Sequence, residues 1–180
     1  KYHPHMDLLI ENIAIENPEA IFIVSKGLKK KNIEFVIKRW KKFAPTALSQ
    51  CIFKESMSKN DYLEILSNVD LLLDPIYFGC GTTGFDAMAV GLPVVTMPGL
   101  QSRGRIMSGI YQVMDIENAP IAKDENEYIR LCTLLASSSI LRQELKTKIY
   151  NGYNRLGIMK NSTIQEMIEF FKDAVQGAMT

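Results

Sequence analysis

The fold is decided by residues 74–99, which read DPIYFGCGTTGFDAMAVGLPVVTMPG. An apolar strand is predicted directly before this stretch, over Val69 to Leu73, and a second strand near its end, over Pro93 to Thr96. Between them lie a glycine-rich loop and a predicted helix over Thr82 to Val90. Because backbone N–H groups at a helix start are unpaired and carry partial positive charge, this arrangement suits a phosphate.

On the amino-terminal side of this stretch, predicted helices and strands alternate. We expect helices over Pro4 to Asn17, Asn32 to Phe43 and Ser58 to Ser67, and strands over Ala20 to Ser25 and Gln50 to Lys54. Alternation of helices with nearly continuous apolar strands predicts an α/β fold with a Rossmann-like, doubly wound parallel sheet. Ligands of such sheets bind beyond the carboxyl ends of the strands, where the glycine-rich loop lies.

After Gly99 the pattern becomes helical, apart from a possible short edge strand over Ala119 to Ala122. The predicted helices cover 102–111, 125–136, 140–150 and 162–178. We therefore expect a single domain over residues 1–180 with a helical C-terminal end from about residue 124. The chain begins at Lys1 rather than at a methionine, so a piece of a longer protein is expected.

Composition excludes several classes of function. A net charge of +1 argues against nucleic acid as the main partner, and no apolar run reaches the length of a membrane span. The three cysteines lack a C-x-x-C spacing and the two histidines have no further ligands beside them, so neither a disulfide framework nor a metal site is expected. A cytoplasmic protein fits these features, with Trp40 and Cys80 as packing residues.

The same motifs resemble the catalytic core of the O-linked N-acetylglucosamine transferase family, which includes the SPINDLY-type O-fucosyltransferases. The likeness lies in glycines followed by Thr-Thr and an acid, over Gly79 to Ala87, and in Gly-x-Pro-Val-Val-Thr-x-Pro-Gly, over Gly91 to Gly99. It implies the C-terminal half of a GT-B fold, which holds most of the sugar nucleotide. The likeness covers nearly the whole chain but only one half of such an enzyme, without its acceptor-binding half or TPR array.

Four residues of the loop and helix are expected to hold the nucleotide. Thr82 and Thr83 stand at a helix start, where hydroxyls and N–H groups bind a diphosphate, although one threonine as a simple N-cap is the alternative. Asp86 lies one turn past Thr82 on the same face, and the resemblance assigns it to the ribose hydroxyls. The alternative is an acid that is favourable at a helix start. Gly81, a histidine in some family members, leaves its backbone N–H for the ligand.

The remaining site residues follow from the resemblance. Met57, Lys59 and Tyr62 match the pocket for the base, where Tyr62 would stack on uracil. Arg105 matches a family arginine of the sugar-nucleotide site. Lys1 matches a catalytic lysine near the leaving phosphate, where a cation would neutralise developing charge. Each role has an ordinary alternative. Lys1 would be simply a terminal lysine, Lys59 an exposed lysine, and Arg105 an arginine that caps a helix.

The resemblance implies transfer of a sugar, most simply from UDP-N-acetylglucosamine, to a protein Ser or Thr hydroxyl, with no metal and no cofactor. The partners would be the nucleotide sugar and a protein acceptor bound by the missing half or by TPR repeats. Alternatives are another GT-B enzyme (a bacterial glycan glycosyltransferase, a GDP-fucose-dependent O-fucosyltransferase or a UDP-sugar epimerase) and a non-catalytic nucleotide-sugar-binding module. The chain by itself is expected to be inactive.

Overall fold

A computed structural model describes residues 2–26, 30–156 and 161–177 and has the expected mixed α/β fold with parallel strands. Strand β1 (Phe22–Ser25) pairs in parallel with β2 (Cys51–Lys54), and β3 (Leu72–Leu73) pairs in parallel with β4 (Val94–Val95). Thr96 forms a further parallel bridge to Ile121, which bears out the short edge expected there. The hydrogen-bonded ladders thus form two separate parallel pairs, and β3 and β4 are shorter than the apolar runs that contain them.

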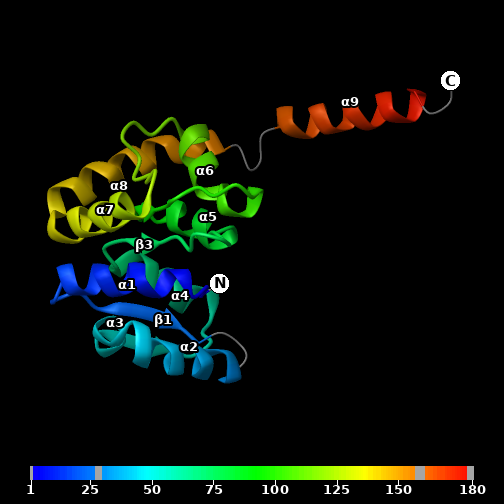
Figure 1. Cartoon of the computed structure of the whole chain (residues 1–180). Coiled ribbons are helices and arrows are strands. Elements are labelled where there is room, and N and C mark those ends of the chain that lie inside the picture. The colour runs from blue at the N-terminus through cyan, green and yellow to red at the C-terminus, as the bar shows by residue number, and fades with distance from the viewer. Residues whose placement is uncertain (1, 27–29, 157–160, 178–180) are drawn as a thin grey trace.

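Helices cover both pairs of strands (Figure 1). Their bounds are α1 His5–Glu16, α2 Lys30–Phe43, α3 Pro45–Ser49, α4 Lys59–Asn68, α5 Thr82–Ala89, α6 Ile106–Met114, α7 Glu125–Ser137, α8 Ser139–Tyr153 and α9 Asn161–Gly177. Short 3₁₀ turns lie at Ser102–Gly104 and Asn154–Leu156. The five-residue helix α3 was not expected, and the helix expected over 102–111 is divided into a 3₁₀ turn and α6.

The two faces of the β3–β4 pair support two apolar clusters. Val94 belongs to the cluster with α4, α5, α6 and α8, whereas its neighbour Val95 belongs to the cluster with α1, α2, α3 and α7. Both valines are fully buried. Since successive side chains of a strand point to opposite faces, this short strand is buried on both sides, as a parallel sheet between helical layers requires.

A buried polar contact joins α1 to α2. Asp7 is 2% exposed and accepts hydrogen bonds from the guanidinium of Arg39, at 2.5 and 2.9 Å, and from Nε1 of Trp40, at 2.8 Å. Trp40 is 1% exposed, which confirms its expected place in the core. Three donors on one carboxylate offset the cost of burying its charge.

Strand β4 depends on the side chain of Tyr111 in α6. The Tyr111 hydroxyl accepts from the N–H of Val94 at 2.8 Å and donates to the carbonyl of Val94 at 3.0 Å. Burial raises the pKa of this hydroxyl, which therefore remains a neutral donor and acceptor.

Replacing Tyr111 by phenylalanine is expected to lower the free energy of unfolding by about 2 kcal/mol, because two buried backbone groups lose their partner. Urea unfolding followed by the fluorescence of Trp40 measures this. Tyr150→Phe is the control, since the Tyr150 hydroxyl also donates to a backbone carbonyl, that of Val90, but its side chain is half exposed. Equal effects of the two substitutions would contradict the assignment.

The last helix differs from the others in its exposure. Ile164, Met167, Phe171 and Val175 form an apolar stripe along α9 and are all more than half exposed, and α9 stands apart from the packed helices (Figure 1). Within the described residues, no helix combines the length and apolarity needed to cross a membrane.

Candidate functional site

Two loops at the carboxyl ends of β3 and β4 are bound to each other. The N–H of Gly79, in the loop after β3, donates to the carbonyl of Arg103 at 3.0 Å, in the loop after β4. Gly104 lies so close that a Cβ added to it would be 3.3 Å from the carbonyl oxygen of Ile76. These two loops form the edge of the sheet at which ligands of parallel α/β folds bind.

Asp74, the residue that follows β3, shapes the glycine-rich loop. It is 2% exposed. Its Oδ1 accepts from the N–H of Cys80 at 2.5 Å, and its Oδ2 accepts from the hydroxyl of Thr96 at 2.6 Å. A single carboxylate therefore folds the loop back over the strand end and ties it to β4. The sequence analysis placed Asp74 at the strand end without assigning it this role. Cys80, which was expected to fill space, is buried here.

The predicted phosphate site is the start of helix α5. Gly81 is its N-cap residue, and no side chain caps the first turn. Thr82 is exposed at this position. The Thr83 hydroxyl is enclosed and has no hydrogen-bond partner among the described residues. An enclosed hydroxyl without a partner costs about 1–3 kcal/mol, so an acceptor supplied at this helix start would be stabilising.

The structure brings three predicted site residues together across α4 and α5. The Nζ of Lys59 lies 2.5 Å from Oδ1 of Asp86 and 5.9 Å from the centre of the Tyr62 ring. Asp86 is on the second turn of α5, and its side chain is 17% exposed, against 57% for Lys59. The resemblance to the family predicts Lys59 as part of the pocket for the base. In the structure its ammonium instead contacts Asp86, the carboxylate predicted for the ribose.

Tyr62 presents a neutral ring beside this ion pair. Burial raises the pKa of its hydroxyl to about 12, and the nearby carboxylate of Asp86 adds to this rise. The side chain is partly buried against the apolar cluster around α5. A partly exposed, uncharged aromatic ring offers a face on which a planar base can stack.

The other predicted residues are placed less directly. The Nε of Arg105 donates to the carbonyl of Gly99 at 2.6 Å, which keeps this exposed arginine on the loop after β4. Its neighbour Ile106 lies 3.8 Å from the position that a Cβ on Gly81 would take, so the two loops approach at the start of α5. Met57 is partly buried in the loop before α4. Lys1, the predicted catalytic residue, lies outside the described residues.

The N-terminal segment contacts the glycine-rich loop. Nδ1 of His5 is 2.8 Å from the Tyr77 hydroxyl, and Nε2 of His5 is 2.6 Å from Oε1 of Glu125 in α7. The ring of His3 packs edge-on against Tyr77, with 4.4 Å between ring centres. The sequence alone excludes these histidines from a metal site and gives them no other role, because their partners lie 72 and more residues away.

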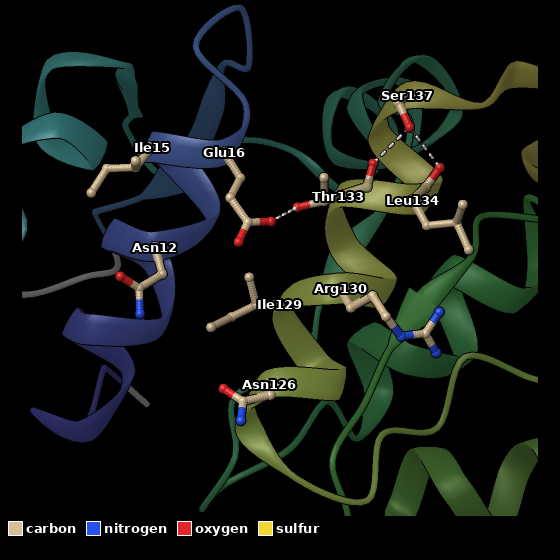
Figure 2. A pocket seen from close by; sticks show the side chains of 9 residues that line it. All are labelled: Asn12, Ile15, Glu16, Asn126, Ile129, Arg130, Thr133, Leu134 and Ser137. Atoms are coloured by element: carbon tan, nitrogen blue, oxygen red, sulfur yellow. Dashed lines mark hydrogen bonds between the residues drawn. The ribbon is translucent and has the colours of Figure 1, made fainter.

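Two hollows on the surface lie away from this group. One, of about 600 Å³, is lined by α1 and α7, where Glu16 accepts a hydrogen bond from Thr133 at 2.9 Å (Figure 2). The other, of about 220 Å³, lies at the amino ends of β3 and β4 and includes Asp70 and Arg142. Neither hollow shares a residue with the predicted site. Thr82 and Lys59 are exposed, so this part of the predicted site lies on an open surface.

Comparison with known proteins finds relatives of the whole arrangement. A solved structure of a mutant O-GlcNAc transferase from Thermobaculum terrenum superimposes with a TM-score of 0.81 at 20% sequence identity, over 97% of this chain and 35% of that chain. UDP-glucose:protein N-beta-glucosyltransferases from Actinobacillus pleuropneumoniae, serotypes 5b and 7, are 30% identical over 99 residues. That match covers 54% of this chain, which spans about a sixth (16%) of the length of these relatives.

The family itself is shown by a longer match. Residues 26–164 fit the family model of glycosyl transferase family 41, a range that contains both loops and helices α4, α5 and α6. With the strand–loop–helix geometry and the superposition, this range shows that the chain belongs to glycosyl transferase family 41.

Proposed function

We propose that the chain is the nucleotide-sugar-binding half of a glycosyltransferase that transfers a sugar from a UDP-sugar to a protein. The observation that carries this proposal is the uncapped start of α5 at the carboxyl ends of two parallel strands, with Asp86 on the same helix and Tyr62 beside it. Phosphate, ribose and base thus have adjacent partners of suitable chemistry.

The proposed division of work follows from the positions of these groups. The diphosphate lies at the start of α5 and receives hydrogen bonds from Thr82, Thr83 and the backbone N–H of Gly81. The carboxylate of Asp86 accepts from the ribose hydroxyls, and Tyr62 stacks on the base with Met57 at the edge of that pocket. Membership of the family supports these roles.

In the transfer, the bond between the anomeric carbon and the diphosphate oxygen breaks, and a new bond forms to the acceptor oxygen. The acceptor hydroxyl loses its proton to a general base, a role that we assign to no residue of this chain. The helix start, Arg105 and Lys1 would stabilise the charge that develops on the leaving diphosphate, with no metal ion. By itself the chain is expected to bind the nucleotide weakly and to be inactive.

For the donor we propose UDP-N-acetylglucosamine and for the acceptor a Ser or Thr hydroxyl. The Gly-Thr-Thr-Gly-Phe-Asp motif supports this choice, as does the fold shared with an O-GlcNAc transferase. The closer sequence likeness to UDP-glucose:protein N-beta-glucosyltransferases makes UDP-glucose and an asparagine acceptor the second candidate. Both candidates share the UDP site.

The test is calorimetric titration of the full-length parent protein with UDP, GDP, UDP-N-acetylglucosamine and UDP-glucose. We expect UDP to bind more tightly than GDP, and Asp86→Ala to weaken UDP binding by about 10- to 100-fold, because a charged hydrogen-bond acceptor is lost. Asp61→Ala is the matched control, since Asp61 is also an acid near a helix start but is exposed in α4.

Three of the alternatives predict different results. A preference for GDP would indicate an O-fucosyltransferase, and tighter binding of UDP-glucose would favour the second candidate. A transfer assay on the same protein covers the remaining case, since nucleotide binding without transfer to any protein acceptor would indicate a binding module. The absence of binding to all four ligands would overturn the proposal.

A further inference from the structure

The ion pair between α4 and α5 assigns Lys59 a different task from that of a base-reading residue. Lys59 is the first residue of α4, directly after Ser58, whose hydroxyl caps the helix by accepting from the N–H of Asp61 at 3.2 Å. From this start its ammonium reaches across to Asp86 at 2.5 Å. The cap therefore places the lysine, and the lysine in turn contacts the predicted ribose-binding carboxylate.

The two ends of this pair differ in burial, which indicates which one is held in place. The side chain of Asp86 is 17% exposed and comes from a helix packed into the apolar cluster. Lys59, at 57% exposed, retains water around its ammonium, and its other neighbour is the Tyr62 ring at 5.9 Å. Within the described residues, the short contact from Lys59 goes to Oδ1, which orients the carboxylate so that Oδ2 can accept a hydrogen bond from a ligand.

We propose that Lys59 is a positioning residue for Asp86: it orients the carboxylate for the ribose and does not discriminate between bases. This inference rests on the proposed nucleotide site. Because every ribonucleotide presents the same two hydroxyls, Lys59 contributes equally to binding of UDP and GDP, and its contribution depends on the presence of the Asp86 carboxylate.

A double-mutant cycle in the full-length protein tests this role, with UDP, 2′-deoxy-UDP and GDP as calorimetric probes. We expect Lys59→Met to weaken UDP binding roughly fivefold, which is the scale of the contribution of a partly exposed ion pair. The same substitution should weaken GDP binding by the same factor and 2′-deoxy-UDP binding by much less. Adding Lys59→Met to Asp86→Asn should change nothing further. Lys59→Arg should restore binding, and Lys42→Met is the control for loss of an exposed lysine.

The outcomes separate this inference from the function on which it rests. If wild type binds UDP but the two substitutions act additively, Lys59 acts independently of Asp86 and the inference is overturned. If Lys59→Met weakens UDP binding and spares GDP binding, Lys59 reads the base, which also overturns the inference. If wild type binds no nucleotide, both the proposed function and this inference are contradicted. Melting curves of each variant establish that the fold is retained.

Discussion

Replacing Asp74 by alanine is expected to lower the free energy of unfolding by about 2–4 kcal/mol and to abolish nucleotide binding. The carboxylate is 2% exposed, and its two oxygens accept from the N–H of Cys80 and the hydroxyl of Thr96. Alanine leaves both donors buried without these acceptors, and the glycine-rich loop loses its link to the end of β4. Urea unfolding measures the first effect and titration with UDP the second.

Two substitutions show whether the hydrogen bonds are the cause. Asp74→Asn keeps the shape of the side chain, and its amide oxygen can accept from Cys80 while its amide N–H donates to the Thr96 oxygen. We therefore expect it to lower the free energy of unfolding by less than half as much as Asp74→Ala. Thr96→Val removes one donor, so its free energy of unfolding should lie between those of wild type and Asp74→Ala. An alanine variant that unfolds at the wild-type urea concentration would show that the carboxylate does not organise this loop.

Replacing Gly84 by valine is expected to destabilise the protein by about 3 kcal/mol, because the first turn of α5 cannot keep its place against α6. A Cβ at this position would lie 2.3 Å from the sulfur of Met107, which is fully buried. Either the buried Met107 side chain or the helix start must then shift, and a shift of the helix start moves the predicted phosphate site with it. Thermal unfolding and UDP titration of the full-length protein measure the two consequences.

A neighbouring glycine and a compensating change provide the controls. A Cβ on Gly81 has its nearest neighbour, the side chain of Ile106, at 3.8 Å, so Gly81→Ala should be tolerated. Met107→Ala makes room at Gly84, so the double variant with Gly84→Ala should be less destabilised than the sum of the two single variants. Strict additivity of the two changes would argue against the contact.

Much of the fold is predictable because its signals are local. The Ser58 cap and the helix from Thr82 are confirmed, and the strand predicted over Val69 to Leu73 is found in a shorter form, Leu72–Leu73, since each depends on neighbours within a few residues. Helix α3, Pro45–Ser49, was missed because five residues are too few to show a helical period. The division of residues 102–114 into a 3₁₀ turn and helix α6 was missed because it depends on a contact with a distant loop, in which Gly104 lies close to the carbonyl of Ile76.

Less of the candidate site is predictable, since its contacts join distant segments. Spacing and resemblance singled out Lys59, Tyr62 and Asp86, and the structure places the three side by side. They did not indicate the ion pair between Lys59 and Asp86, which joins residues on different helices. Nor did they indicate that His5 reaches Tyr77, because a histidine in an isolated sequence gives no sign of its partner.

The sequence by itself therefore determined the strand–loop–helix unit, its glycine-rich loop and the residue types available for a nucleotide, because hydrogen bonding and apolar periodicity over short spans specify them. Only the tertiary structure decided what several of those residues contact. It placed the Asp74 carboxylate between Cys80 and Thr96, pressed Gly84 against Met107 and paired Lys59 with Asp86. The reason is physical: such contacts depend on the packing of α4, α5 and α6 around β4, which no local pattern encodes.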